Sequence, residues 1–238
     1  MIKPGKVVDL THNLDHRTIR WPTDPGFAYS YDDYGRAPEG YFYAAGHFSS
    51  PDHAGTHMDA PLHFNGEGLH AGQVPVASLV GPAAVIDFST RALADPDAVL
   101  LPADIARYER IHGPIPAGAI VVAHSGWGRF WGDPRRYLGT QTPEDASGLH
   151  FPGFSFDAAR LLLELREVIA IAIDTASLDP GNHAGYPVHR LWLGANRPGF
   201  ENLADVDKLP ASGALLVCAP MKIYGATGAP ARIFAVLP

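Results

Sequence analysis

Four short apolar runs constrain the fold of this 238-residue chain more than any other feature. Each run is bounded by Gly, Pro or Asp, a pattern typical of strands that are buried on both faces. The runs are GPAAVIDFS (81–89), AIVVAHSG (119–126), VIAIAID (168–174) and GALLVCAP (213–220). Further strands are expected at 6–10, at 41–50 and in the closing ARIFAVL (231–237).

Helices are expected at 102–110, where PADIARYER starts with a proline, and at 155–167. In the second segment Ser155 can cap a stretch that has apolar residues at helical spacing. The 25 glycines and 22 prolines indicate many tight connections. No linker-like tract, charge block or repeat divides the chain. The sequence therefore predicts an α/β protein, a single β-rich mixed domain over residues 1–238.

Composition argues against nucleic-acid binding, membrane binding and a disulfide-stabilised fold. The net charge of -7 is spread along the chain, without the Lys/Arg stripe that nucleic-acid or membrane-surface binding needs. The single cysteine, Cys218, excludes a disulfide framework and is expected to be a buried small hydrophobe. The N-terminus lacks the apolar core of a signal peptide, and no segment reaches the roughly 18 apolar residues of a membrane span. A cytoplasmic protein is expected.

The segment HAGTHMDAPLHF contains three histidines and an aspartate within eleven positions. On one continuous helix Asp59 would point about 120° or more away from both His53 and His57, and Pro61 would break that helix. On a straight strand these side chains would face one side, but the two histidines would be about 13 Å apart. Gly55 permits a bend that brings two imidazoles and a carboxylate to one point. This spacing therefore indicates metal coordination.

Imidazole and carboxylate ligands suit zinc, manganese or ferrous iron. With no cysteine available in the motif, a closed structural zinc site is not expected, which favours an open site that retains water, and hence catalysis. His63 ends the motif. Its unperturbed pKa near 6.5 suits it to take a proton from activated water and return it to a departing nitrogen or oxygen.

The motif resembles the signature of the putative cyclase family of metal-dependent hydrolases, which includes kynurenine formamidase, isatin hydrolase and trans-dienelactone hydrolase. The resemblance covers most of the chain, and its segments occur in the family's order. They are TIRWPTDP (18–25), VVAHSGWGRFW (121–131), HFPGFSFDAARLL (150–162), IAIDTASLDPG (171–181), HRLWLGAN (189–196) and the segment 201–236.

This resemblance implies a ligand set for the metal. The family's first ligands fall on His53, His57 and Asp59. In two-zinc members a second set falls on His189 and Glu201, with Asp59 bridging the two ions. The implied cofactor is zinc or manganese, with one or two ions per chain.

The resemblance also implies a fold, an assembly and a catalytic residue. Members have a swivelling β/β/α fold and form oligomers, so a homodimer or homotetramer is expected. His63 matches the family's proton-transfer residue. Two departures are visible: DTAS (174–177) replaces Asp-Thr-Pro-Ser, and the segment 132–150 is longer than in compact formamidases. The longer segment favours the isatin hydrolase branch.

The expected substrate is a small aromatic or cyclic amide, lactam or lactone, which the reaction would open. Trp21 and Phe27 could stack on a flat aromatic substrate. His183 lies six residues before His189 and is expected at the edge of the site.

Two other functions are compatible with the histidine cluster. A non-haem iron oxygenase or lyase can use a His-His-Asp facial triad, and a metal-holding protein without turnover can use the same ligands. Five candidate ligands exceed what a facial triad requires. A site used only for binding has no need of a proton carrier such as His63. The sequence therefore favours a metal-dependent hydrolase.

Overall fold

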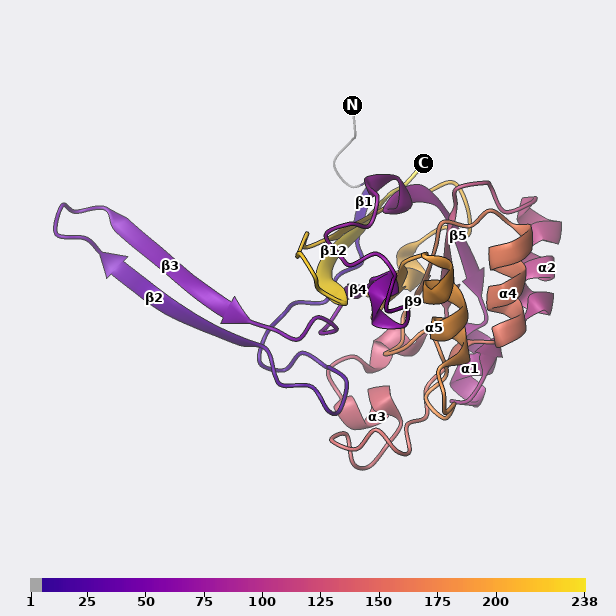
Figure 1. Cartoon of the computed structure of the whole chain (residues 1–238), viewed down its shortest axis with the longest axis horizontal. Coiled ribbons are helices and arrows are strands. Elements are labelled where there is room, and N and C mark those ends of the chain that lie inside the picture. Colours follow the sequence, from indigo (N-terminus) through magenta and orange to yellow (C-terminus); the bar gives the residue numbers. More distant parts are fainter. Residues whose placement is uncertain (1–5) are drawn as a thin grey trace.

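A closed barrel of seven strands lies at the centre of the protein in a computed structural model that describes residues 6–238 (Figure 1). The strand order is β12-β11-β5-β7-β9-β10-β4, and β4 pairs with β12 to close the barrel. β1 (Val7–Asp9) pairs with the C-terminal part of β12. The barrel strands are β4 (His57–Asp59), β5 (Val80–Asp87), β7 (Ile120–His124), β9 (Ala170–Ile173), β10 (Gly199–Glu201), β11 (Leu215–Pro220) and β12 (Gly228–Val236).

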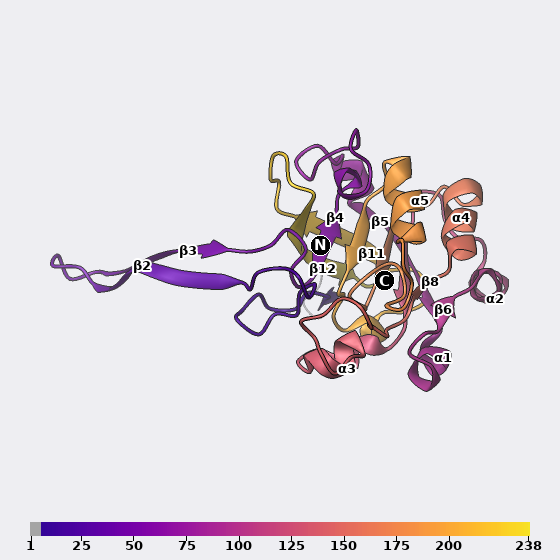
Figure 2. The same ribbon diagram turned by 60° about the horizontal axis from the view of Figure 1, so that its bottom comes forward.

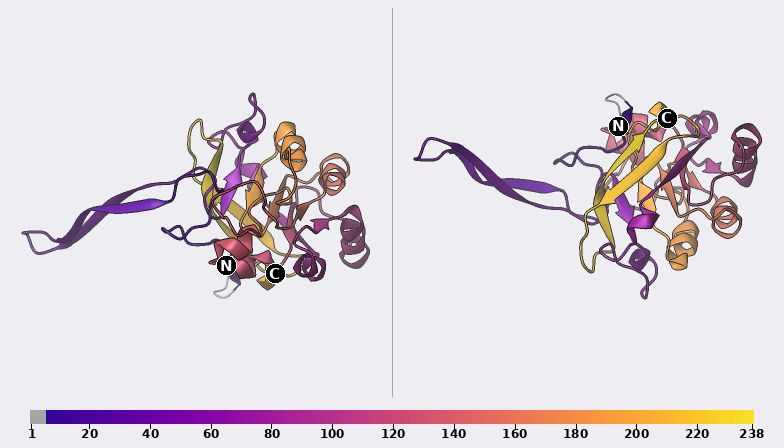
Figure 3. Two further views of the ribbon diagram at one scale, coloured as in Figure 1. Left: turned by 90° about the horizontal axis from the view of Figure 1, so that it is seen from below. Right: turned by 90° about the horizontal axis from the view of Figure 1, so that it is seen from above.

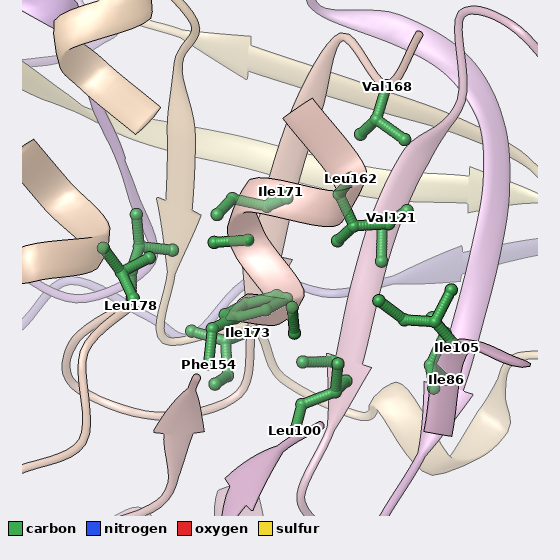
Figure 4. Close-up of a cluster of buried hydrophobic side chains, with 14 of the residues drawn as sticks. Ile86, Leu100, Ile105, Val121, Phe154, Leu162, Val168, Ile171, Ile173 and Leu178 are labelled. Carbon is green, nitrogen blue, oxygen red and sulfur yellow. The ribbon is translucent and has the colours of Figure 1, made fainter. Parts of the chain in front are cut away.

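Strands β5, β7, β9 and β10 run parallel, and alternate residues of the first three enter two separate hydrophobic clusters. Val122 faces the interior of the barrel, whereas Val121 faces an outer cluster beneath the helices. In that outer cluster, Leu162 packs near Val121 and Ile171 (Figure 4). Burial on both faces explains why these strands have continuous apolar sequences.

Helices cover the outer side of the parallel strands (Figures 1 and 2). The longer ones begin where the sequence provides caps. The hydroxyl of Ser155 accepts a hydrogen bond from the backbone N–H of Ala158, and Pro102 is the first residue of its helix. None of the helices in the described part of the chain is both long and apolar enough to cross a membrane. The helices are α1 (Ser89–Ala94), α2 (Pro102–His112), α3 (Pro134–Leu138), α4 (Phe156–Leu165) and α5 (Pro187–Trp192).

The β-rich α/β class predicted from the sequence is confirmed, and most long elements lie where they were expected. Helix α2 extends two residues beyond the predicted end, and α4 stops two residues short of it. The prediction of a strand buried on both faces is wrong for 213–220. In β11 the outward residues are less buried, with Leu215 at 43% exposed, because the helices within residues 6–238 lie over the parallel strands instead. Cys218 is buried inside the barrel, as expected of a small hydrophobe.

Two small sheets lie outside the barrel. The predicted strand at 41–50 is present as β3 (Phe42–Ser49), but it pairs with the unpredicted β2 (Ala28–Arg36) in a long antiparallel hairpin. This hairpin projects from the side of the body opposite to α2 and α4 (Figures 1 to 3). The strands β6 (Val99–Leu100) and β8 (Gly153–Phe154) form a short parallel pair.

Candidate metal centre

The antiparallel pair β4–β10 places three candidate ligands on one face. In its register His57 lies opposite Glu201. Asp59 is two residues from His57 and therefore points to the same side, because side chains alternate along a strand. Met58 and Phe200 point the other way, into the core of the barrel. Packing of Met58 and Phe200 in the barrel core thus fixes the two strands, and with them the candidate ligands on the opposite face.

His53 reaches the same place through a turn before β4. Gly55 has a φ of +61° in this turn, which is the left-handed conformation that glycine adopts most readily. The His53 Nδ1 atom lies 2.7 Å from Oδ1 of Asp59, and the centroids of the His53 and His57 rings are 5.1 Å apart. The bend that the sequence predicted at Gly55 is therefore present.

Helix α5 carries His189 to the opposite side of the cluster. The His189 Nε2 atom lies 3.1 Å from Oδ2 of Asp59 and 3.2 Å from Oε1 of Glu201. Asp179 fixes this geometry: its carboxylate accepts hydrogen bonds from the backbone N–H groups of Val188 and His189 and contacts the His189 Nδ1 atom at 2.6 Å. One side chain thus holds both the start of the helix and the imidazole.

The five residues that the sequence singled out as ligands come together in two groups. His53, His57 and Asp59 form one group; Asp59, His189 and Glu201 form the other. Within each group the candidate ligand atoms lie within 4.8 Å of one another. Asp59 belongs to both groups, which is the arrangement that a bridging carboxylate requires.

The hydrogen bonds of the imidazoles favour a cation between them and the carboxylates. The Nδ1 atom of His57 lies 2.9 Å from the carbonyl oxygen of Gly55, which can only accept, so Nδ1 must carry the proton. In a neutral ring the lone pair of Nε2 then faces the oxygens of Asp59 and Glu201, at 3.1 and 3.4 Å. Two lone pairs repel at that distance unless a metal ion or a proton lies between them.

Burial of the carboxylates also favours a bound cation. Asp59 is 1% exposed and Glu201 4%, and within residues 6–238 both form ion pairs only with histidines. Burial opposes a charge on His57, but hydrogen bonds that the protonated ring donates to the carboxylates of Asp59 and Glu201 outweigh it and raise the pKa of His57 to about 10. The pKa of His189 is likewise raised against the effect of burial. The cluster therefore needs positive charge, and this donor set fits a divalent zinc or manganese ion.

The cluster forms one wall of a cavity of about 310 Å³. Aromatic rings of Trp21, Phe64 and Tyr186 line another part of it. The remaining lining residues are the apolar Ile19 and Ala176 and the polar or charged Arg20, Thr23, Asp24, Ser177 and Asn202. His63 follows the strand in a 3-10 turn, and its ring centroid lies 4.0 Å from that of His53. Neighbouring atoms exclude part of the water around the His63 ring, which disfavours the protonated form and lowers the pKa of His63. The residue keeps some contact with solvent, which weakens this effect. The neutral ring can accept a proton at pH 7.

The three predicted substrate residues lie in different places. Trp21 lines the cavity, where its ring meets that of Tyr186 at a centroid distance of 6.2 Å. Phe27 is outside the lining and packs on Phe48 at the base of the hairpin. His183 is also outside it: the residue is exposed, and its Nδ1 atom contacts the carbonyl of Ala184. The geometry thus supports a substrate contact for Trp21 and not for the other two.

Three residues of the site were missed in the sequence. Phe64 and Tyr186 were not separated from other aromatics, and Asp179 stood unremarked within IAIDTASLDPG. The sequence carries no local signal for Asp179, because an acidic residue eight positions before Pro187 can cap the helix that starts there only through a folded-back loop. That loop geometry is not visible without the structure.

Replacing Asp179 by asparagine is expected to weaken metal binding about 10- to 100-fold. The amide can no longer accept the hydrogen bonds of both α5 N–H groups and the His189 ring. Competition with a chromogenic chelator measures the affinity. The matched control is Asp133→Asn, because Asp133 also caps a helix start, that of α3, but contacts none of the candidate ligands. Equal affinities for the Asp179 variant and the wild type would contradict the role of Asp179.

Comparison with known proteins gives the family. The profile of the family described as "Putative cyclase" matches residues 8–180, which is well over half of the chain. The chain belongs to the putative cyclase family. Within this family it is 36% identical to an isatin hydrolase of Roseibium aggregatum over 208 residues, covering 84% of this chain and 77% of that protein.

More distant members and solved structures agree with this assignment to the cyclase family. A kynurenine formamidase of Sphingopyxis alaskensis is 27% identical over 96% of both chains. The crystal structure of an isatin hydrolase bound to the product analogue thioisatinate superposes with a TM-score of 0.89 at 32% identity, covering 98% of this chain and 92% of that one. The isatin hydrolase A of Ralstonia solanacearum gives the same TM-score and identity.

Proposed function

We propose that this protein is a metal-dependent hydrolase that opens the C–N bond of an amide or lactam, with an isatin-like lactam as its preferred substrate. One observation carries the proposal: Asp59 is shared by two buried ligand groups at the wall of an aromatic cavity. The identity of 36% to an isatin hydrolase, against 27% to a kynurenine formamidase, supports a lactam over formylkynurenine.

The proposed ligands are His53, His57 and Asp59 for one ion, and Asp59, His189 and Glu201 when a second ion is present. Zinc or manganese is the proposed metal. When bound, such an ion lowers the pKa of water towards 7 and polarises a substrate carbonyl.

The other residues bind the substrate and move the proton. The flat ring of a lactam fits between Trp21, Phe64 and Tyr186, whose side chains line the cavity. His63 accepts the proton of the attacking water at an imidazole nitrogen and gives it to the departing ring nitrogen, which completes the cleavage of the C–N bond. Its position beside His53, and outside both ligand groups, leaves its nitrogens available for this transfer.

Several finer features remain predictions that rest on the sequence and its family resemblance. They are opening of lactones, a homodimer or homotetramer, a cytoplasmic location, and action of residues 1–238 as one domain. An iron oxygenase or lyase is the alternative. The second ligand group, with His189 and Glu201, argues against it because a facial triad uses three protein ligands.

Metal content and substrate turnover test the proposal together. The untagged protein is expected to contain about one or two zinc or manganese ions per chain by plasma mass spectrometry. It should hydrolyse isatin with a higher kcat/KM than N-formylkynurenine or a simple lactone, and chelation should abolish turnover until metal is restored. Stoichiometric iron with oxygen uptake would favour the oxygenase, and metal without turnover of any substrate would favour a binding role.

A further inference from the structure

The carbonyl oxygen of Gly55 accepts two hydrogen bonds beside the candidate ligands. One comes from Nδ1 of His57, at 2.9 Å, and the other from Nδ2 of Asn202, at 2.8 Å. The two nitrogens lie 3.5 Å apart, and since both carry hydrogen, both donate to the shared oxygen. A carbonyl oxygen has two lone pairs, and here both are used. Asn202 therefore fixes the oxygen that sets the tautomer of His57.

Asn202 is itself held firmly by its surroundings. The residue is 4% exposed, its backbone N–H donates to the carbonyl of Thr175 at 2.9 Å, and its own carbonyl accepts from the hydroxyl of Thr56 at 2.6 Å. Its φ is +56°, in the left-handed region that asparagine enters more readily than most residues. A residue that its contacts hold in this region is typical of a functional site.

The side-chain oxygen of Asn202 is held by Tyr137, a residue of α3. Tyr137 is fully buried, and its hydroxyl lies 2.8 Å from Oδ1 of Asn202 and 3.1 Å from the carbonyl oxygen of Asp174. Both oxygens can only accept, so the hydroxyl donates towards them. Helix α3 lies below the barrel in Figure 1, within the segment 132–150 that the sequence singles out for its length. This segment thus reaches the metal centre through Asn202.

Two other candidate ligands are supported by a single group each. Asp179 holds the ring of His189, and the backbone N–H of Leu178 donates to Oε1 of Glu201 at 2.8 Å. The support of His57 is instead a chain of hydrogen bonds that begins in α3. Partners of this kind fix the orientation of a ligand ring and raise its basicity.

We propose that Asn202 and Tyr137 are positioning residues for His57. Tyr137 orients the amide of Asn202, the amide fixes the Gly55 carbonyl, and this carbonyl holds the imidazole with Nε2 facing the two buried carboxylates. The proposal rests on the proposed function, because the orientation of His57 affects the reaction only if its Nε2 atom binds an ion.

The affinity for cobalt(II), measured by competition with a chromogenic chelator, tests this role. Tyr137→Phe removes only the hydroxyl and should weaken cobalt binding about 10-fold, because the amide of Asn202 stays in place but loses its orienting donor. Asn202→Gly removes the donor to the Gly55 carbonyl, and glycine adopts the left-handed backbone without strain. This variant should weaken cobalt binding about 100-fold.

The matched control is Tyr108→Phe. Tyr108 is also buried, and its hydroxyl donates to a backbone carbonyl, that of Ala211 at 3.2 Å, but its ring packs in the outer cluster beneath the helices. This control should bind cobalt like the wild type. If Tyr137→Phe and Asn202→Gly also bind cobalt as tightly as the wild type, the two residues serve only the stability of the fold, and the proposal is overturned.

A double variant tests whether the two residues act along one path. Tyr137→Phe/Asn202→Gly should bind cobalt no more weakly than Asn202→Gly alone, whereas independent effects would multiply to about 1,000-fold. At saturating cobalt, the visible absorption reports the coordination geometry and should differ from the wild type in both single variants but not in Tyr108→Phe. Losses that multiply, or spectra identical to the wild type in both single variants, would overturn the proposed path.

The wild type separates this role from the proposed function. A wild type that binds neither cobalt nor zinc would overturn both. A wild type that binds metal and hydrolyses isatin, with unchanged affinities in Tyr137→Phe and Asn202→Gly, would leave the hydrolase in place and overturn the positioning role alone.

Discussion

Replacing His57 by alanine is expected to abolish metal binding and hydrolysis together. Its Nε2 atom contacts both buried carboxylates, at 3.1 Å from Asp59 and 3.4 Å from Glu201, so that it is central to the whole cluster. Without this ligand the metal content should fall below about a tenth of an ion per chain. Loss of the metal removes several kcal/mol of transition-state stabilisation, so kcat/KM should fall roughly 10³-fold or more.

The control for this variant must separate loss of the ligand from loss of the fold. Removal of His57 leaves two buried carboxylates with less compensating charge, which destabilises the barrel where β4 closes it. Metal content is therefore measured on material whose circular dichroism matches the wild type. His112→Ala removes an exposed imidazole from the end of α2 and should change neither quantity. A folded His57→Ala protein with full metal content would refute the assigned ligand.

The sequence could predict part of this site because the motif is local. His53, His57 and Asp59 lie within seven positions, and the need for a bend identifies Gly55 without any tertiary information. Glu201 differs, because it meets His57 only through the register of β4 and β10. Each of these strands has three residues, too few to leave a periodic pattern. Glu201 was therefore accessible only through the family resemblance.

Strand β2 of the projecting hairpin was missed for a related physical reason. Strand prediction relies on alternation between apolar and polar residues, and the bulge at Asp32 interrupts that alternation within β2. The exposed tyrosines of β2 also lie on a hairpin outside the barrel, so their pattern cannot be explained by the core of their own chain. The long buried strands β5, β7 and β9 were predictable because both of their faces pack within the same chain.

Replacing His63 by alanine is expected to keep the metal and lose most of the turnover. His63 belongs to neither group of candidate ligands, and its ring centroid lies 6.1 Å from that of His189. The variant should therefore retain the metal content of the wild type. Removal of a positioned general acid–base group typically costs 10²- to 10⁴-fold in rate, so kcat should fall by about that factor.

Two further measurements distinguish proton transfer from a packing role of His63. His63→Gln retains a polar side chain of similar size that cannot carry a proton at neutral pH, so it should be as slow as the alanine variant. Added imidazole should partly restore turnover in His63→Ala, because the vacated volume opens to the cavity. If His63→Ala retains full activity with full metal content, the proton must be carried by another group. If the metal is lost as well, the separation between ligand and proton carrier is wrong, and His63 acts on the ion through His53, whose ring it contacts.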